Sequence, residues 1–291
     1  MTMENQDDSQ KDSCDDREKI AILCNVDVTL LSQADTDLAE ERQQLVESLH
    51  NKLQGAFALV TSRTSDSIDK VFSFKPPVSV EHHAAMRAAQ NEKFQPMANP
   101  INTETIAKSA RKELKDHAVL VDDKSDLDDT DEDLNVHIEA KEFSLALHFN
   151  AAATSAHKSL LKGVAYKLLG EYELTDTYRI LQSDNTLELV PNGHSKAQAV
   201  QDFMKTPAFK GKVPVFIGRS GSDAAAMKTC MSKFNGFGIA VGDTIPDAPF
   251  VAARVQDAED VWHLLKGLDN DLSILPSPVG KAGLIKKPGA P

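Results

Sequence analysis

The sequence predicts an α/β fold in which a Rossmann-like core with a parallel sheet is interrupted by a smaller α+β unit. In residues 20–87, apolar runs of strand length alternate with helical patterns, as in a doubly wound sheet. Residues 134–192 predict instead two strands, a helix and a hairpin, which together are typical of a separate α+β unit. From residue 194 onward, helices and strands alternate again. A chain that leaves a parallel sheet and later returns to it predicts a core with an inserted cap.

The first part of the core has clear strand and helix patterns. The apolar run 19–31, "KIAILCNVDVTLL", leaves no room for an amphipathic helix and predicts the first strand. Residues 35–54 have helical spacing of apolar residues, and Gly55 follows as a residue that ends helices. We expect the next elements to be a strand in 56–63, a short helix over 65–73 capped by Ser65 or Asp66, and a strand within 76–87.

The middle of the chain and the part that returns to the core also show strand and helix patterns. Residues 134–149 alternate through two strands, and residues 155–173 predict a helix. Residues 178–192 predict a hairpin with a turn at Asp184-Asn185. The returning core is expected to contain a helix at 195–205, a strand at 213–218, a helix at 222–234, strands at 236–242 and 250–255, and a helix at 258–268.

We therefore expect five regions along the 291 residues. Residues 1–18 are a disordered acidic tail, and residues 276–291 are a flexible tail rich in Gly, Pro and Lys. The core is expected in 19–112 and 194–275, with the α+β cap in 113–193 and an acidic loop at 122–133. Ligands of such folds bind between core and cap, at the carboxyl ends of the parallel strands.

The net charge of −12 is concentrated in two short runs. Residues 1–17 carry six acids and two bases, and residues 122–133 carry eight acids and one lysine. The rest of the chain is close to neutral and shows no basic stripe, which disfavours nucleic-acid binding. The second run alternates acids as a calcium loop does, but it lacks the turn glycine at its sixth position, so we interpret it as a solvated insertion.

The sequence also predicts a protein of the cytoplasm without a membrane span. No apolar run approaches the length needed to cross a bilayer, and the N-terminus has no signal-peptide pattern. The three cysteines are odd in number and far apart, which favours reduced thiols over a disulfide framework.

Polar side chains at the expected strand ends are the candidates for chemistry. Asn25 and Asp27 follow the first strand, where two carboxylates could divide the roles of nucleophile and proton donor. Thr61 and Arg63 follow the second strand and could bind a phosphate oxygen. Lys196 begins a helix at the border of the cleft and suits the same anion. For each position taken alone, an ordinary turn, helix cap or surface lysine is the commoner interpretation.

The loop after the strand at 213–218 is where an acid pair would hold magnesium. Arg219 and Ser220 stand there, and Asp223 is the acid that remains. Magnesium prefers carboxylates in octahedral geometry, which Asp27 and Asp223 alone supply poorly. We expect Arg219 to face Asn25 across the pocket and to bind phosphate bidentately in place of the metal. For His82 and His83, which follow a strand end, we expect a structural or cleft-lining role.

Five segments carry a resemblance to a known family beyond the strand order. They are "LVTSRTSDSIDKVF", "VEHHAAMR", "HIEAKEFSLALHFN", "LELVPNGHSKAQAV" and "FKGKVPVFIGRSGSD". In this order they resemble the trehalose-6-phosphate phosphatases, a branch of the haloacid-dehalogenase-like phosphatases, over residues 19–267. The resemblance implies a core of the haloacid-dehalogenase type and a place in trehalose biosynthesis.

The family releases trehalose from trehalose 6-phosphate with magnesium, and the resemblance implies roles by position. Asn25 matches the nucleophile and Asp27 the general acid/base. Thr61 and Lys196 match phosphate-binding positions. Three cap residues match those that hold the sugar hydroxyls: Glu139, Lys141 and Glu188. The expected ligand is trehalose 6-phosphate or a similar sugar phosphate, and a trehalose-6-phosphate synthase is a candidate partner.

The departures from the family pattern are concentrated at the reaction centre. Asn25 replaces the nucleophilic aspartate, and Arg219 replaces a metal-binding one. The other departures are Val28, Ser62, Asn150, Ser220 and Ala224. An amide is a poor nucleophile and a weaker magnesium ligand than a carboxylate, so magnesium is doubtful here.

Three interpretations remain open. We favour a pseudophosphatase that binds a sugar phosphate without ordinary turnover. An active phosphatase would need deamidation of Asn25 or attack by water assisted by Asp27. The third possibility is a different phosphatase-like enzyme, or a protein with no sugar ligand.

Overall fold

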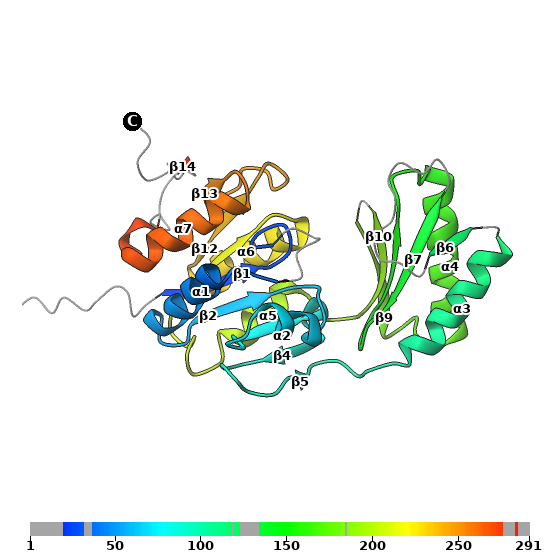
Figure 1. The fold of residues 1–291 in the computed structure, drawn as a ribbon, viewed down its shortest axis with the longest axis horizontal. Helices are drawn as coiled ribbons and strands as arrows, with labels where there is room; N and C mark the ends of the chain where they lie inside the picture. The colour runs from blue at the N-terminus through cyan, green and yellow to red at the C-terminus, as the bar shows by residue number, and fades with distance from the viewer. Residues whose placement is uncertain are drawn as a thin grey trace, which may run out of the picture.

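The computed structural model describes residues 20–31, 37–117, 119–122, 134–183, 185–275 and 283–284. The expected acidic tail, nearly all of the acidic loop, the turn residue Asp184 and most of the C-terminal tail lie outside these residues. The described chain forms two lobes that are joined by two connecting segments, one after β5 and one after β10 (Figure 1).

The larger lobe is built on a nine-stranded sheet with the order β14-β13-β12-β11-β1-β2-β3-β4-β5. The pairs from β14 to β3 are parallel, and β4 and β5 continue the sheet antiparallel. The strands are β1 (Ile20–Asn25), β2 (Phe57–Val60), β3 (Val78–Val80), β4 (Ala85–Arg87), β5 (Gln95–Pro96), β11 (Val213–Gly218), β12 (Phe237–Val241), β13 (Val251–Val255) and β14 (Gly283–Leu284).

Helices cover this sheet on both faces. They are α1 (Glu40–Lys52), α2 (Ser65–Val71), α5 (Lys196–Phe203), α6 (Gly221–Phe234) and α7 (Ala258–Asn270), with short 3-10 turns at Glu81–His83 and Leu272–Ile274. The chain moves one way along the sheet from β1 to β2 and the other way from β11 to β12. Right-handed crossovers therefore place α1 and α6 on opposite faces. Strand β1 lies at the centre, and Ala21–Cys24 are fully buried.

The smaller lobe has its own sheet and its own apolar core. The strand order is β6-β7-β8-β10-β9, with β6 at Leu120–Asp122, β7 at Asn135–Ala140, β8 at Leu145–Phe149, β10 at Thr186–Pro191 and β9 at Tyr178–Gln182. Helices α3 (Thr103–Asp116) and α4 (Ser155–Glu171) cover one face, and the other face is turned toward the larger lobe (Figure 1). The predicted α/β core with an inserted α+β cap is confirmed.

Helix α3 was not predicted from the sequence, and it moves the domain boundary. Asn102 caps it by accepting a hydrogen bond from Thr105 N, and Ile106, Ala110 and Leu114 lie buried in the apolar cluster of the cap. The expected boundary at residue 112 is therefore wrong, because it would divide a helix whose whole buried face packs on the cap sheet. The cap begins before Thr103.

Two smaller differences concern helix ends in the core. Thr64 caps α2 by accepting from Ser67 N, where Ser65 or Asp66 was expected. Gly55, which has a φ of +87°, follows α1 as predicted.

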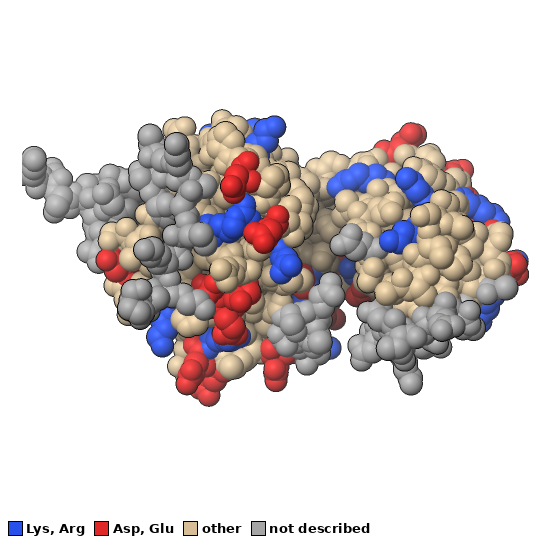
Figure 2. All heavy atoms as spheres, turned by 90° about the horizontal axis from the view of Figure 1, so that it is seen from above, with Lys and Arg blue, Asp and Glu red and all other residues tan. Residues whose placement is uncertain are grey.

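Charged side chains of both signs are intermixed on the face of the molecule in Figure 2, and a notch separates the two lobes. Within the described residues, no helix has the length and apolar character needed to cross a membrane.

One prediction follows from the buried histidines of the core. His83 lies between Ser79 and Asp202, with His83 Nε2 2.9 Å from Asp202 Oδ2. Burial lowers the pKa of His83 below its ordinary value of 6.5, and burial lowers the pKa of His50 and His194 in the same way. Because the unfolded chain then binds more protons below about pH 6.5, stability should fall as the pH falls through and below this value.

The measurement is the melting temperature between pH 8 and pH 5.5. Asp202 does not contribute in this window, since its pKa is lowered to about 2 and its contribution is lost only in stronger acid. His83→Gln should reduce the slope of melting temperature against pH. A melting temperature that is flat or rises on acidification would contradict the prediction.

Candidate active-site cleft between core and cap

The carboxyl ends of three neighbouring strands meet beneath the cap and hold most of the predicted core residues. Strand β1 ends at Asn25, and Thr61 and Gly218 lie at the ends of its two neighbours, β2 and β11. Parallel strands present their carboxyl ends at one edge of a sheet, which is where ligands bind in folds of this type.

Asn25 lies in a buried polar cluster with Lys196 and Asp223. Lys196 Nζ lies 2.9 Å from Asn25 Oδ1 and 2.8 Å from Asp223 Oδ1. Asn25 Nδ2 donates to the Asp27 carbonyl at 2.8 Å, and more weakly to Thr29 Oγ1 at 3.3 Å and Asp223 Oδ2 at 3.4 Å. The amide thus turns its oxygen to an ammonium group and its NH2 to three oxygens. This pattern fixes the orientation of the amide, since the opposite orientation would place a donor against Lys196.

Asp223 is fully buried, and donors surround its carboxylate. Asp223 Oδ2 accepts from the backbone N–H groups of Arg219 and Ser220, at 2.9 and 2.8 Å, and from Ser220 Oγ at 2.8 Å. Ser220 and Asp223 form a capping box at the start of α6. The side chain also lies directly against Gly218, where a Cβ would come within 2.6 Å of Asp223 Cγ. Only glycine at position 218 allows this close approach.

Asp27 is held by the two residues that were expected to bind phosphate after β2. Thr61 Oγ1 donates to Asp27 Oδ2 at 2.8 Å, and Arg63 Nε donates to Asp27 Oδ1 at 2.6 Å. Thr61 Oγ1 also accepts from Arg63 N at 3.0 Å. The three side chains therefore form one compact unit at the ends of β1 and β2.

Arg219 does not face Asn25, so this expectation is wrong. A Cβ built on Gly242, just after β12, would lie 3.6 Å from Arg219 Cζ, which places the guanidinium beside the neighbouring strand end. The backbone N–H of Arg219 donates to Asp223 Oδ2 at 2.9 Å. Lys196 takes the place beside Asn25 that was expected for Arg219.

The residues present do not fit a magnesium ion. Asp223 already accepts hydrogen bonds from four neighbouring groups besides the contact with Asn25. Asn25 presents an NH2 group to Asp223, and Asp27 is paired with Arg63. Magnesium requires several oxygen ligands that are free to coordinate it. Within the described part of the chain, no three His, Cys, Asp or Glu side chains form a group that could hold a metal.

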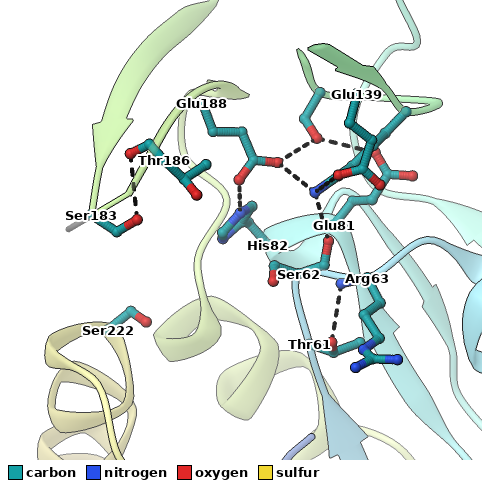
Figure 3. A network of polar contacts seen from close by, with 12 residues as sticks. Thr61, Ser62, Arg63, Glu81, His82, Glu139, Ser183, Thr186, Glu188 and Ser222 are labelled. Atoms are coloured by element: carbon teal, nitrogen blue, oxygen red, sulfur yellow. Dashed lines mark hydrogen bonds and ion pairs between the residues drawn. The ribbon is translucent and has the colours of Figure 1, made fainter. Parts of the chain in front are cut away.

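The predicted cap residues form a second buried network at the contact with the core (Figure 3). Lys141 Nζ lies 3.0 Å from Glu188 Oε1 and donates to the Ser62 carbonyl of the core at 3.2 Å. Glu188 Oε2 lies 2.8 Å from His82 Nε2, also of the core. Two of the three residues expected to hold sugar hydroxyls therefore join the cap to the core.

The charges of this network stabilise one another. Burial by itself would raise the pKa of Glu188, but Lys141, His82 and Ser144 hold that pKa well below its usual range. Burial would likewise lower the pKa of Lys141, but Glu188 and Glu139 raise it above its usual range. Both groups are therefore ionised at neutral pH.

Glu139 lies at the edge of this network and is the most accessible of the predicted cap residues. Its side chain is 40% exposed, with Oε2 3.0 Å from His148 Nε2 and 3.5 Å from Lys141 Nζ. Although burial opposes ionisation, His148 and Lys141 lower the pKa of Glu139 overall. Glu139 is thus a partly exposed anionic acceptor beside Lys141 and His148.

Two buried residues of this network were not predicted from the sequence. Glu81 Oε2 accepts from the Phe143 backbone N–H at 2.9 Å, and Ser144 Oγ donates to Glu188 Oε1 at 2.7 Å. Burial raises the pKa of Glu81. Glu81, His82 and His83 all have positive φ values, of 46°, 57° and 79°, which are uncommon for residues other than glycine. A cluster of such residues is typical of functional or tightly constrained turns.

The chain matches known proteins over most of its length. The trehalose-phosphatase family model matches residues 44–244, which is more than half of the chain. The trehalose-6-phosphate phosphatase of Escherichia coli strain K12 is 26% identical over 215 residues, covering 73% of this chain and 71% of that protein.

Solved structures share the fold at lower identity. The C-terminal domain of a Candida albicans trehalose-6-phosphate phosphatase superposes with a TM-score of 0.62 at 14% identity, covering 88% of this chain and 93% of that one. The C-terminal domain of the Candida albicans trehalose synthase regulatory protein gives 0.58 at 10% identity, covering 85% and 93%. A Bacteroides thetaiotaomicron protein described among the phosphatases of the haloalkanoate (HAD) enzyme superfamily gives 0.55 at 13% identity, covering 90% and 98%. Together with the match of the family model, these comparisons lead to one conclusion: the chain belongs to the trehalose-phosphatase family.

Proposed function

We propose that this protein binds a sugar phosphate, with trehalose 6-phosphate as the first candidate, between core and cap, and that it hydrolyses this ligand weakly or not at all. The observation that carries the proposal is the Asn25–Lys196–Asp223 cluster. Family membership supports a sugar-phosphate ligand, whereas the cluster argues against the reaction.

The amide of Asn25 carries protons that a carboxylate at this position would lack. An aspartate at position 25 would place an oxygen where Asn25 Nδ2 now lies, 2.8 Å from the Asp27 carbonyl and 3.4 Å from Asp223 Oδ2. Two buried oxygens at such distances repel unless a proton or a cation lies between them. The amide removes this need for a metal and at the same time removes the nucleophile.

In this proposal Lys196, Thr61 and Arg63 supply the positive and polar groups for the phosphate. Asn25 occupies the nucleophile position without attacking, and Asp27 occupies that of the general acid/base. Glu139, Lys141 and Glu188 bind sugar hydroxyls, each of which both donates and accepts. A ligand that uses Lys141 or Glu188 must replace their contacts with Ser62 and His82.

The proposal includes a biological role, a protein partner and a cellular compartment. We infer a regulatory role from the amide at the nucleophile position, and the C-terminal domain of a trehalose synthase regulatory protein is one example of a protein with this fold. A trehalose-6-phosphate synthase is the protein partner that such a role suggests, and the cytoplasm is the compartment.

The first test combines phosphate release with thermal stability. We expect purified protein to release no phosphate from trehalose 6-phosphate at ordinary enzyme rates of about 1–1000 per second, with or without magnesium. We expect the same ligand to raise the melting temperature, because a ligand at 100 times its Kd adds about 2.7 kcal/mol of stability. Glucose and inorganic phosphate serve as control ligands.

Two outcomes would contradict the proposal. Release at an ordinary rate that Asn25→Ala abolishes would show an active magnesium-dependent phosphatase. No shift with any sugar phosphate would show a protein without this ligand. The triple variant Asn25→Asp, Arg219→Asp and Ser220→Asp should gain magnesium-dependent release if the rest of the site is intact.

A further inference from the structure

The carboxylate of Asp27 occupies the donors that a ligand phosphate would need. Thr61 Oγ1 and Arg63 Nε lie 2.8 and 2.6 Å from its two oxygens. A hydroxyl and a guanidinium that converge on two oxygens of one anion form a site suited to a phosphate. Here the anion is supplied by the chain itself.

The backbone fixes Asp27 in this place. The Asp27 carbonyl accepts from Asn25 Nδ2, and Val28 N donates to the Leu31 carbonyl at 2.7 Å, which closes a tight turn. Val28 has a φ of 56°, a conformation that costs a β-branched residue energy and persists only where the surroundings enforce it. These contacts hold the backbone of Asp27 beside Thr61 and Arg63.

The two described cations of the cluster, Lys196 and Arg63, each already pair with a carboxylate of the chain. Lys196 is shared between Asn25 and Asp223, and Asp223 is occupied by its own donors. Asn25, Asp27 and Asp223 do not fit a magnesium ion, because their polar atoms already have partners in the chain. A phosphate dianion that approaches Thr61 and Arg63 must therefore compete with a fixed carboxylate a few ångströms away, at a cost set by Coulomb repulsion.

We propose that Asp27 is the residue that determines the charge of the ligand this site accepts. It disfavours a fully ionised phosphate and favours a group that presents an O–H to the carboxylate, such as a monoanionic phosphate or a sugar hydroxyl. This inference rests on the proposed function, since it concerns the same pocket. The loss of a residue that binds the ligand would ordinarily weaken binding. Removal of the Asp27 carboxylate should instead strengthen the binding of a phosphate.

The test compares Asp27→Asn with the wild type by isothermal titration calorimetry at pH 7.5 without magnesium. We expect Asp27→Asn to bind trehalose 6-phosphate and inorganic phosphate at least about tenfold more tightly, and neutral trehalose no more tightly than the wild type does. The matched control is Asp66→Asn, which removes the same charge from an exposed residue at the start of α2 and should change each affinity less than about twofold.

The outcomes separate this inference from the proposed function. If the wild type binds trehalose 6-phosphate and Asp27→Asn binds it equally or less tightly, the inference is wrong and the proposed function stands. If no variant prefers the sugar phosphate to inorganic phosphate, the proposed function fails, and the affinities for inorganic phosphate still decide the role of Asp27. Asp27→Ser removes the same charge with a smaller side chain and should reproduce the gain if the asparagine variant folds poorly.

Discussion

Replacement of Asp223 with alanine should lower the free energy of unfolding by about 3–5 kcal/mol. The change leaves the Lys196 ammonium buried with only an amide oxygen as partner. It also leaves the N–H groups of Arg219 and Ser220 without the acceptor that caps α6. Chemical denaturation followed by circular dichroism measures the effect.

Matched variants identify the cause of this loss. Asp66→Ala removes an exposed carboxylate from the first turn of α2, and it should cost at most about 1 kcal/mol. The double variant Lys196→Met and Asp223→Leu removes both charges and should be more stable than Asp223→Ala alone. A cost below about 1 kcal/mol for Asp223→Ala would show that the cluster does not stabilise the core.

Replacement of Glu188 with alanine should loosen the contact between cap and core, with a loss of about 3 kcal/mol. The change removes the main carboxylate partner of Lys141 and the partner of His82, both of which are buried. Glu139 remains near Lys141, at 3.5 Å, and compensates only in part. Calorimetry should show a lower or divided unfolding transition, and amide exchange should increase in the Glu81–His83 turn.

The control for this prediction is Glu171→Ala. Glu171 is an exposed cap residue with one long ion pair, 3.9 Å from Lys167 Nζ, and its removal should cost less than about 0.5 kcal/mol. Equal effects of the two variants would mean that the buried network between cap and core contributes no more than a surface pair.

Strands and helices of the core were predictable because each carries its own local pattern. The apolar run of β1, the helical spacing before Gly55 and the return of strands after residue 194 specify a parallel sheet without information from distant residues. Helix α3 also had local signals, in Asn102 as a cap and apolar residues at 106, 107, 110 and 114. These signals are weak because few of the apolar residues are large and charged residues surround them.

The sequence predicts which residues of the candidate site lie close together, but it does not predict which of them are in contact. Strand order places Asn25, Thr61 and the loop after β11 at one edge of the sheet, so their proximity could be predicted. The sequence predicted that Arg219 would face Asn25 from that edge. In the structure Lys196 contacts Asn25 instead, and the Arg219 guanidinium lies beside Gly242, after β12.

The sequence by itself determined the α/β core, the inserted cap and the family resemblance, since these depend on periodicity and on short motifs. Only the tertiary structure decided that Asp27 pairs with Thr61 and Arg63, that Lys196 bridges Asn25 and Asp223, and that Glu188 joins the cap to His82. The physical reason is that each of these contacts depends on side-chain direction between residues distant in the chain. A shift of a few ångströms in one loop would have given each donor a different acceptor.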